Sequence, residues 1–324
     1  MPTIGQNVLT LATPFLTILF LLLAGVALRR WRMVTADGAR QMTSLVLNVT
    51  LPPLIFIALA TEITPAELSR TPLLVGMGIV GPLIGYAVAA AIGRLPLFPP
   101  ARRSTLQAAI GMLNTTFVGY PVCEGLLGSK GLSYAVLYDA GFTLLMSTFS
   151  IWILSWGNQR GTRSLASSLR DLVYSPLMWS VILGVTWGAL GWPMPEWFRM
   201  PLHTLGQATT PLALLAVGML VQATEQGNAG PQHQTKQRWQ LAVLTIARLI
   251  VVPALVWALV LLLKIERTAA AVIVLQTAMP TAVATTAMAE QYGGDSAFAS
   301  ASVILSTFLS VLTLPAWGWV LVGH

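Results

Sequence analysis

Charged residues are scarce in this chain, and so are the residue types from which metal and redox sites are built. Only 9% of its 324 residues are Asp, Glu, Lys or Arg, whereas a soluble protein carries about 25%. The single cysteine, Cys123, has no partner for a disulfide within the chain, and the three histidines lie far apart in the sequence. These shortages exclude a typical cytosolic enzyme and a cysteine- or histidine-based cluster, so we expect no metal site.

The signatures of common intramembrane and nucleotide-dependent enzymes are also missing. The chain has no His-Glu-x-x-His pair, no Walker lysine loop and no paired-aspartate motif. We therefore expect neither an enzyme nor a resident cofactor, and ATP-driven transport would need another subunit. The net charge of +7 does not predict nucleic-acid binding, because Lys and Arg in a membrane chain first report the orientation of its loops.

Apolar sequence, in contrast, is abundant. Hydrophobic residues make up 55% of the chain, and a membrane-spanning helix needs about 20 largely apolar residues in a row. Ten such runs predict an all-α polytopic membrane protein with ten transmembrane helices in a lipid bilayer. The runs are residues 8–28, 38–60, 71–93, 103–126, 130–156, 172–191, 202–223, 239–263, 268–290 and 296–322.

The lysines and arginines predict how these spans are oriented. Twelve of the 18 follow odd-numbered spans, five follow even-numbered spans, and the remaining one, Arg248, falls inside a span. Because basic loops are retained on the cytoplasmic side, both termini are predicted to lie on the non-cytoplasmic side.

A short polar linker at residues 157–171 divides the chain into halves, residues 1–156 and 172–324, with five predicted spans each. An odd number of spans gives the two halves opposite orientations, as in an inverted-repeat transporter. Residues 48–54 of span 2 align with residues 207–213 of span 7, matching an amide, a threonine and a proline. We therefore predict two inverted five-helix repeats.

Span 4 has a polar, helix-breaking centre. Pro121 lacks a backbone donor and obstructs the carbonyl of Phe117, Gly119 loosens the turn before it, and Asn114 and Thr115 place polar atoms just ahead. An unpaired backbone group in hydrocarbon costs several kcal/mol, so a break persists only where protein, water or a ligand satisfies the freed groups. Such a break points to a cavity.

Span 9 has a corresponding centre around Pro280. If the two interrupted helices cross near the midplane, the N-terminal ends of their second halves present positive dipole ends to a common point, which favours an anion. The alternative is that these are ordinary proline kinks whose Ser and Thr side chains bond back to their own helices. The predicted substrate-binding residues, in addition to the buried arginine considered next, are Asn114, Thr115, Gly119, Pro121, Gln276, Pro280, Thr281, Thr285 and Asn48.

Two ionisable residues are predicted to lie deep in the membrane. Asp139 is nine residues beyond Lys130 in span 5, and Arg248 is nine residues beyond Trp239 in span 8. Each residue would lie about 13 Å from opposite faces of a core about 30 Å thick, so the two could meet. We assign Asp139 to proton or cation coupling and Arg248 to a substrate carboxylate. A structural Asp–Arg pair and a snorkelling Arg248 remain alternatives.

Several motifs together closely resemble those of the auxin efflux carrier family. The resemblance covers essentially the whole chain, and the signatures of spans 4 and 9 are its most specific part. The motifs are Leu51-Pro-Pro-Leu-Ile-Phe56, Asn114-x-x-x-x-Gly119-x-Pro121, Ala278-Met-Pro280, Ala289-x-x-Tyr292-x-x-Asp295, Ser306-Thr-x-x-Ser310 and Leu314-Pro315.

The resemblance implies ten spans in two inverted repeats with crossed, broken helices 4 and 9, a fold related to bile acid:sodium symporters. It implies a scaffold domain of spans 1, 2, 6 and 7, through which a homodimer is conceivable, and a transport domain of spans 3–5 and 8–10. Plant members export the auxin anion, and bacterial members are associated with small dicarboxylates such as malate and malonate. One departure is Thr285, which stands where plant members have a second proline.

We therefore expect a secondary active transporter in a bacterial inner (cell) membrane that moves a small organic anion by alternating access. The alternatives are an uncoupled uniporter or channel for organic anions and a carrier for an auxin-like aromatic acid. The coupling ion, proton or sodium if there is one, and the direction of transport stay open, because backbone carbonyls at helix breaks would also suit sodium.

Overall fold

The structure is a computed structural model that describes residues 4–65, 67–150, 153–154, 174–221 and 231–322. Within these ranges the secondary structure is helical, without a β-strand, and one isolated antiparallel bridge joins Leu113 to Thr281. An all-helical chain with apolar helices agrees with the predicted polytopic membrane protein. The predicted linker at 157–171 lies outside the described residues.

The helices of the first half follow the predicted spans closely at their ends. They are α1 (Ile4–Arg30), α2 (Ala36–Leu45), η1 (Val46–Thr50), α3 (Leu51–Glu62), η2 (Glu67–Arg70), α4 (Thr71–Ile92), α5 (Pro100–Gly111), η3 (Thr115–Gly119), α6 (Tyr120–Leu145) and η4 (Met146–Ser150). Predicted spans 4 and 5 are joined by α6, which bends at Gly128, where φ is 67°. Only glycine adopts this backbone region readily.

The second half contains a similar succession of helices. They are α9 (Pro176–Ala189), α10 (Glu196–Gln207), α11 (Thr209–Val221), α12 (Pro231–Ile246), η5 (Ala247–Val251), α13 (Val252–Leu262), α14 (Arg267–Thr277), α15 (Ala284–Tyr292) and α16 (Ser296–Val322).

Among the described residues, five helical stretches are long and apolar enough to cross a membrane by length and composition. They are Thr13–Arg30, Ala36–Glu62, Glu67–Ile92, Thr235–Leu262 and Ser296–Val322, which coincide with predicted spans 1, 2, 3, 8 and 10. Predicted spans 4, 7 and 9 are interrupted helices, and span 6 falls on the short helix α9. The full count of ten spans and the inverted repeat therefore stay predictions.

Three widened turns inside long helices have a common cause. The π-helical turns η1, η3 and η5 each end two residues before a proline, namely Pro52, Pro121 and Pro253. The prolyl ring offers no N–H and crowds the carbonyl four residues earlier, so the preceding backbone shifts to a wider turn.

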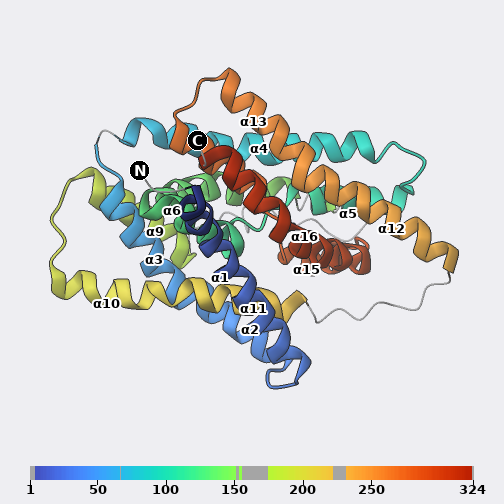
Figure 1. Ribbon diagram of the computed structural model, residues 1–324, viewed down its shortest axis with the longest axis horizontal. Helices are drawn as coiled ribbons and strands as arrows, with labels where there is room; N and C mark the ends of the chain where they lie inside the picture. Colours follow the sequence, from blue (N-terminus) through green and yellow to red (C-terminus); the bar gives the residue numbers. More distant parts are fainter. Residues whose placement is uncertain (1–3, 66, 151–152, 155–173, 222–230, 323–324) are drawn as a thin grey trace.

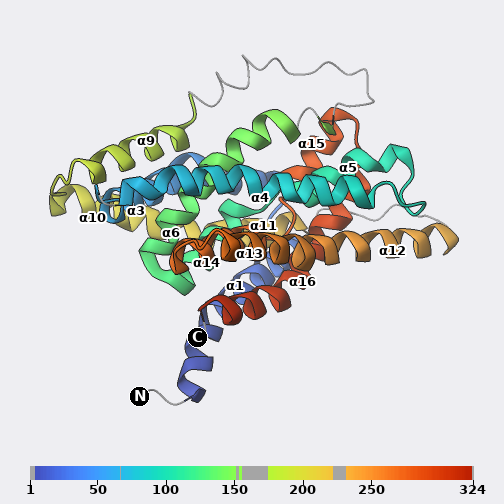
Figure 2. The same ribbon diagram turned by 90° about the horizontal axis from the view of Figure 1, so that it is seen from above.

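The helices form two groups in space. Figure 1 shows α2 and α3 (blue) beside α10 and α11 (yellow) on one side, and α4, α5, α12 and α13 on the other. Both views show α12 and α13 running along α4 and α5, with which they are in contact (Figures 1 and 2). The helix α6 contacts members of both groups, and α1 packs against α11 and α16. The breaks of predicted spans 4 and 9 thus lie among the helices of the second group.

Candidate functional site at a helix crossing

Two unwound segments lie against each other, residues 112–114 between α5 and η3 and residues 278–283 between α14 and α15. The N–H of Asn114 donates to the carbonyl of Pro280 at 2.9 Å, and the N–H of Ala282 donates to the carbonyl of Met112 at 3.0 Å. Each segment thereby satisfies backbone groups that the other leaves free, as buried backbone requires. The structure thus brings the breaks of predicted spans 4 and 9 together.

The break in span 4 begins earlier than the sequence predicts. Pro121 lies in the first turn of α6, where a residue needs no N–H for the helix. The chain unwinds instead at residues 112–114, and η3 connects this break to the proline. In span 9 the proline itself, Pro280, lies within the unwound segment, as predicted.

Asp139 binds side chains at the beginning of the helix that follows the first break. Its buried carboxylate accepts hydrogen bonds from the hydroxyls of Thr115, Thr116 at 3.0 Å and Tyr120 at 2.8 Å. The two threonines are the first residues of η3, and the tyrosine begins α6. A carboxylate is favoured here by three donors and by the positive end of the helix dipole.

Arg248 binds backbone carbonyls at the end of the helix that precedes the second break. Its guanidinium is fully buried, and Nη2 donates to the carbonyls of Thr277 at 2.7 Å and Met279 at 2.6 Å. Carbonyls at the end of a helix lack intrahelical partners, and a cation suits them. The atoms Nε and Nη1 have no hydrogen-bond partner among the described residues. This arginine therefore keeps unused donor capacity inside the protein.

The two buried charges do not pair with each other. Asp139 is bonded to Thr115, Thr116 and Tyr120, and Arg248 to two backbone carbonyls, and no Asp139–Arg248 ion pair exists in the described part of the chain. The alternative of a structural Asp–Arg pair is therefore wrong, and full burial also excludes a snorkelling Arg248. Each charge is matched to one broken helix end instead.

Two side-chain amides carry further unpaired groups at the crossing. The buried Asn114 leaves Nδ2 without a partner in the described residues, and Gln276 leaves Oε1 without one. The Nε2 of Gln276 donates to the carbonyl of Ala135 at 3.3 Å. A methyl group on Gly119 would overlap the Gln276 amide oxygen, so the absence of a side chain at Gly119 is what lets the amide lie against this turn.

The predicted threonines of span 9 stabilise the crossing itself. Thr281 Oγ1 donates to the carbonyl of Ala109 at 2.8 Å, and the N–H of Thr281 donates to Ser306 Oγ at 3.1 Å. Thr285 is buried, with its hydroxyl 3.8 Å from Met112 Sδ. These contacts join α5, the second break and α16, so both hydroxyls already have partners.

Asn48 lies apart from the crossing, because its hydrogen bonds within the described residues go to Ser44. It is exposed in η1, and Nδ2 donates to Ser44 O at 2.8 Å and Ser44 Oγ at 3.2 Å. The remaining predicted residues, from both halves of the chain, lie within or beside the two breaks.

Sequence reasoning missed three contributors to this site. Thr116 and Tyr120 hold the Asp139 carboxylate, and Ser306 of α16 caps the unwound segment of span 9. Tyr120 stands one residue before the proline and close after the polar cluster. Its position could have indicated a role, but only the fold shows that Asp139 lies opposite it.

Ionic clusters lie at the ends of the same helices. The Glu67 carboxylate contacts Lys130 Nζ at 3.0 Å and Arg70 Nη1 at 3.0 Å, and accepts the Tyr134 hydroxyl. Arg70 Nη1 is also 3.9 Å from Glu266. Burial opposes ionisation of Glu266, but hydrogen bonds from Ala269 and Thr268 hold its pKa below the usual value. These contacts connect η2, α6 and α14.

Asp295 is more enclosed than a solvated loop acid. Its Oδ2 lies 2.7 Å from Arg102 Nε, and its Oδ1 accepts the N–H of Phe298 at 2.9 Å at the start of α16. Arg102 also donates to Gln240 Oε1 at 2.7 Å. Asp295 is thus half-buried in an ion pair, whereas Glu290 is exposed. The aspartate joins α5, α12 and α16.

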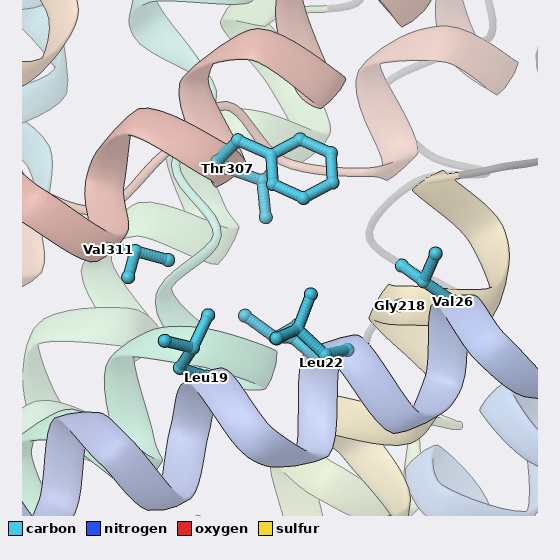
Figure 3. A pocket seen from close by; sticks show the side chains of 8 residues that line it. Leu19, Leu22, Val26, Gly218, Thr307 and Val311 are labelled. Atoms are coloured by element: carbon cyan, nitrogen blue, oxygen red, sulfur yellow. The ribbon is translucent and has the colours of Figure 1, made fainter.

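A separate cavity between α1, α11 and α16 has an apolar lining. Leu19, Leu22 and Val26 of α1 face Thr307 and Val311 of α16, with Gly218 of α11 beside them (Figure 3). No charged group lines it. The cavity therefore does not fit an anion, and the polar helix crossing is the stronger candidate site.

Comparison with known proteins identifies the family. A family model described as membrane transport protein matches residues 10–318. An uncharacterized transporter of Methanothermobacter thermautotrophicus is 27% identical over 94% of this chain and 97% of its own length. The uncharacterized transporter YfdV of Escherichia coli is 22% identical over 94% of this chain and 96% of its own.

A plant protein matches a smaller part. Auxin efflux carrier component 8 of Arabidopsis thaliana is 23% identical over 48% of this chain and 42% of its own length. The names of all three relatives are those of transporters or carriers rather than enzymes. Together with the family match over nearly the whole chain, they establish that this multi-pass membrane protein belongs to the membrane transport protein family, the auxin efflux carriers that its motifs resemble.

Proposed function

We propose that the protein is a secondary active transporter for a small organic anion, and that the helix crossing is its binding centre. The observation that carries the proposal is the set of unpaired donors buried there. Arg248 Nε and Nη1 and Asn114 Nδ2 lack partners in the described residues. Buried donors without partners are costly, and a carboxylate supplies the acceptors that they need.

The charges at the crossing also support an anion. Asp139 already accepts three hydrogen bonds from Thr115, Thr116 and Tyr120, whereas Arg248 makes two bonds to neutral carbonyls through one of its three nitrogens. The acidic group is thus satisfied while the basic group keeps free N–H groups. A carboxylate entering between Asn114 and the guanidinium would meet donors from both halves of the chain.

Alternating access needs two bodies that move against each other, and glycine contacts support the predicted division. Within the proposed scaffold, a methyl group on Gly25 of α1 would overlap the Leu215 carbonyl of α11, and one on Gly218 would overlap the Leu22 carbonyl. Within the proposed transport domain, a methyl group on Gly78 of α4 would overlap the Tyr138 carbonyl of α6. Such backbone-to-backbone contacts fix helices relative to each other.

The contacts across the proposed boundary are of a different kind. Gly318 of α16 faces side chains, with the Phe15 ring of α1 3.1 Å from an added Cβ, and Gly125 of α6 faces the Pro14 side chain. The apolar cavity of Figure 3 lies on the same boundary. Side-chain contacts of this kind, to which the 3.4 Å hydrogen bond from Thr210 of α11 to Glu124 of α6 is added, are compatible with one domain moving along the other, with the crossing exposed to each side in turn.

The proposed substrate class is a carboxylate, with small dicarboxylates of the malate and malonate type first. The name of the plant relative makes an auxin-like aromatic acid the second candidate. Asp139 is the proposed coupling group, because it is the buried acid at the crossing. An uncoupled uniporter with the same site is the alternative mechanism.

The test is thermal stabilisation of the purified protein by malate, malonate, other carboxylates and indole acetate, with and without sodium. A ligand that binds only the folded state raises the melting temperature. At a ligand concentration of about 100 times Kd, the free energy of unfolding rises by about 2.7 kcal/mol. We expect at least one carboxylate to stabilise the wild type and Asn114→Ala to lose the effect. The matched control is Gln41→Ala, which removes an exposed amide from α2. This variant should still be stabilised by the carboxylate. Stabilisation by neutral or cationic compounds alone would contradict an anion carrier.

A further inference from the structure

Three hydroxyl donors converge on the Asp139 carboxylate, and one of them belongs to a residue predicted to bind the substrate. Thr115 donates to Oδ1, and Thr116 and Tyr120 donate to Oδ2 at 3.0 and 2.8 Å. These donors lie directly after Asn114, whose Nδ2 is unpaired in the described residues. The carboxylate of the protein thus occupies the hydroxyl of Thr115, a residue predicted to bind the substrate, next to the unpaired amide of Asn114.

We propose that Asp139 is an internal competitor of the substrate: its ionised carboxylate holds the Thr115, Thr116 and Tyr120 hydroxyls in the substrate-free protein, and its protonation releases them. This inference rests on the proposed anion site at the crossing and specifies how binding there is coupled. A proton taken up from water by an Asp139 oxygen would accompany each bound carboxylate.

The competition follows from hydrogen-bond stoichiometry. A hydroxyl carries one hydrogen, so Thr115 cannot donate fully to Asp139 and to a substrate at the same time. A buried carboxylate that loses its donors is unfavourable, and two carboxylates that share a site do not both stay ionised. Protonated Asp139 becomes a donor itself and needs no hydroxyl from Thr115.

In the described part of the chain, no cation forms an ion pair with Asp139 that would remove the competition. On its own helix, Tyr120 and Tyr138 are the titratable groups that interact electrostatically with it. Tyr138 Oη lies 3.0 Å from Thr277 Oγ1, and Arg248 is bonded to the Thr277 carbonyl and not to Asp139. The remaining titratable or charged groups on elements packed against α6 are Arg29 and Arg30 of α1, Glu62 of α3, Glu67 and Arg70 of η2, Tyr86 of α4, His203 of α10 near Glu124, and Arg267 of α14 beside Glu266.

The experiment compares malonate binding to wild type and Asp139→Asn between pH 5.5 and pH 8 by calorimetry. Asparagine keeps the shape of the side chain but carries no charge to hold the donors. We expect wild-type affinity to rise as the pH falls, and the variant to bind at least about tenfold more tightly than wild type at pH 8. The affinities of wild type and Asp139→Asn for malonate should become equal near pH 5.5. Protonation of malonate itself affects both proteins equally.

Glu124→Gln is the matched control, because it removes another acid from the same helix, one that faces Thr210 at 3.4 Å instead of the crossing. It should keep the wild-type pH dependence. Tyr120→Phe removes one donor to Asp139 without touching Thr115, and should move the midpoint of the pH profile to higher pH. This second variant decides the question if Asp139→Asn does not fold.

Two results would overturn the inference while leaving the anion site intact. One is equal or weaker malonate binding by Asp139→Asn at pH 8, with binding still lost in Asn114→Ala. The other is a pH profile of Tyr120→Phe that coincides with that of wild type. If neither malonate, malate nor indole acetate binds to wild type or to Asp139→Asn at any pH, the proposed function itself is wrong, and the competition with it.

Discussion

Each of the two helix breaks at the crossing has a buried charged side chain beside it, and the two charges are of opposite sign. At the first break, the acid Asp139 holds the hydroxyls that begin η3 and α6. At the second, the base Arg248 holds the carbonyls that end α14. A helix beginning has spare N–H groups and a helix end has spare carbonyls. The sign of each buried charge therefore suits the dipole of the helix end beside it, although Asp139 binds side-chain hydroxyls and Arg248 binds backbone carbonyls.

The breaks also differ in how completely they are closed. Every hydroxyl that faces Asp139 is engaged with it, whereas Arg248 leaves Nε and Nη1 unpaired within the described residues. The hydroxyls of the first break are thus engaged, although Asn114 Nδ2 beside them is unpaired within the described residues, and the second break retains unpaired donors on a buried cation. This difference suggests where an external anion enters and which internal group it must displace.

The largest expected effect is at the second break. Arg248→Met should lower the free energy of unfolding by about 3 kcal/mol, because two buried carbonyls lose their donor. Thermal denaturation in detergent, followed by circular dichroism, measures this. Arg248→Lys should recover part of the stability through one ammonium group, but not carboxylate binding. A methionine variant as stable as wild type would show that the second break needs no charge.

A smaller effect is expected where the first break touches the second. Gly119→Ala places a methyl group on the Gln276 amide oxygen, so the amide must rotate and lose its bond to Ala135. We expect about 1 kcal/mol of destabilisation and clearly weaker carboxylate binding in the same thermal assay.

Gly76→Ala in α4 is the matched control, because an added Cβ there meets nothing within 4 Å, and alanine favours a helix. It should melt at or slightly above the wild-type temperature. The double variant Gly119→Ala with Gln276→Ala should regain stability without regaining binding. Unchanged binding by Gly119→Ala alone would remove Gln276 from the site.

Much of the crossing could be predicted from the sequence, because polar and helix-breaking residues in apolar runs are costly without a structural reason. Asn114, Gln276 and Pro280 stand out by this rule, and the structure brings them together. The start of the first break could not be predicted, because Pro121 fits the first turn of a helix as well as it fits a kink. The backbone hydrogen bonds from Ala282 to Met112 and from Asn114 to Pro280 fix where the break begins, and they connect segments far apart in sequence.

The partners of the two buried charges were also beyond prediction. Depth from the membrane faces placed Asp139 and Arg248 at similar levels but gave no information on their lateral positions. The alignment of the two halves stays a prediction. Thr50 and Thr209, which it pairs, are both buried, and the η1 turn and the α10–α11 interruption both precede a proline. Asn48, matched by the same alignment, bonds to its own helix.

Counterflow in proteoliposomes tests most directly whether the crossing is the centre of a carrier. Vesicles preloaded with the carboxylate that stabilises the protein should accumulate the labelled compound transiently and saturably. Asn114→Ala, with its melting temperature unchanged, should reduce this uptake to that of empty vesicles. Non-saturable flux without counterflow, or wild-type counterflow in the variant, would contradict an alternating-access carrier built on this crossing.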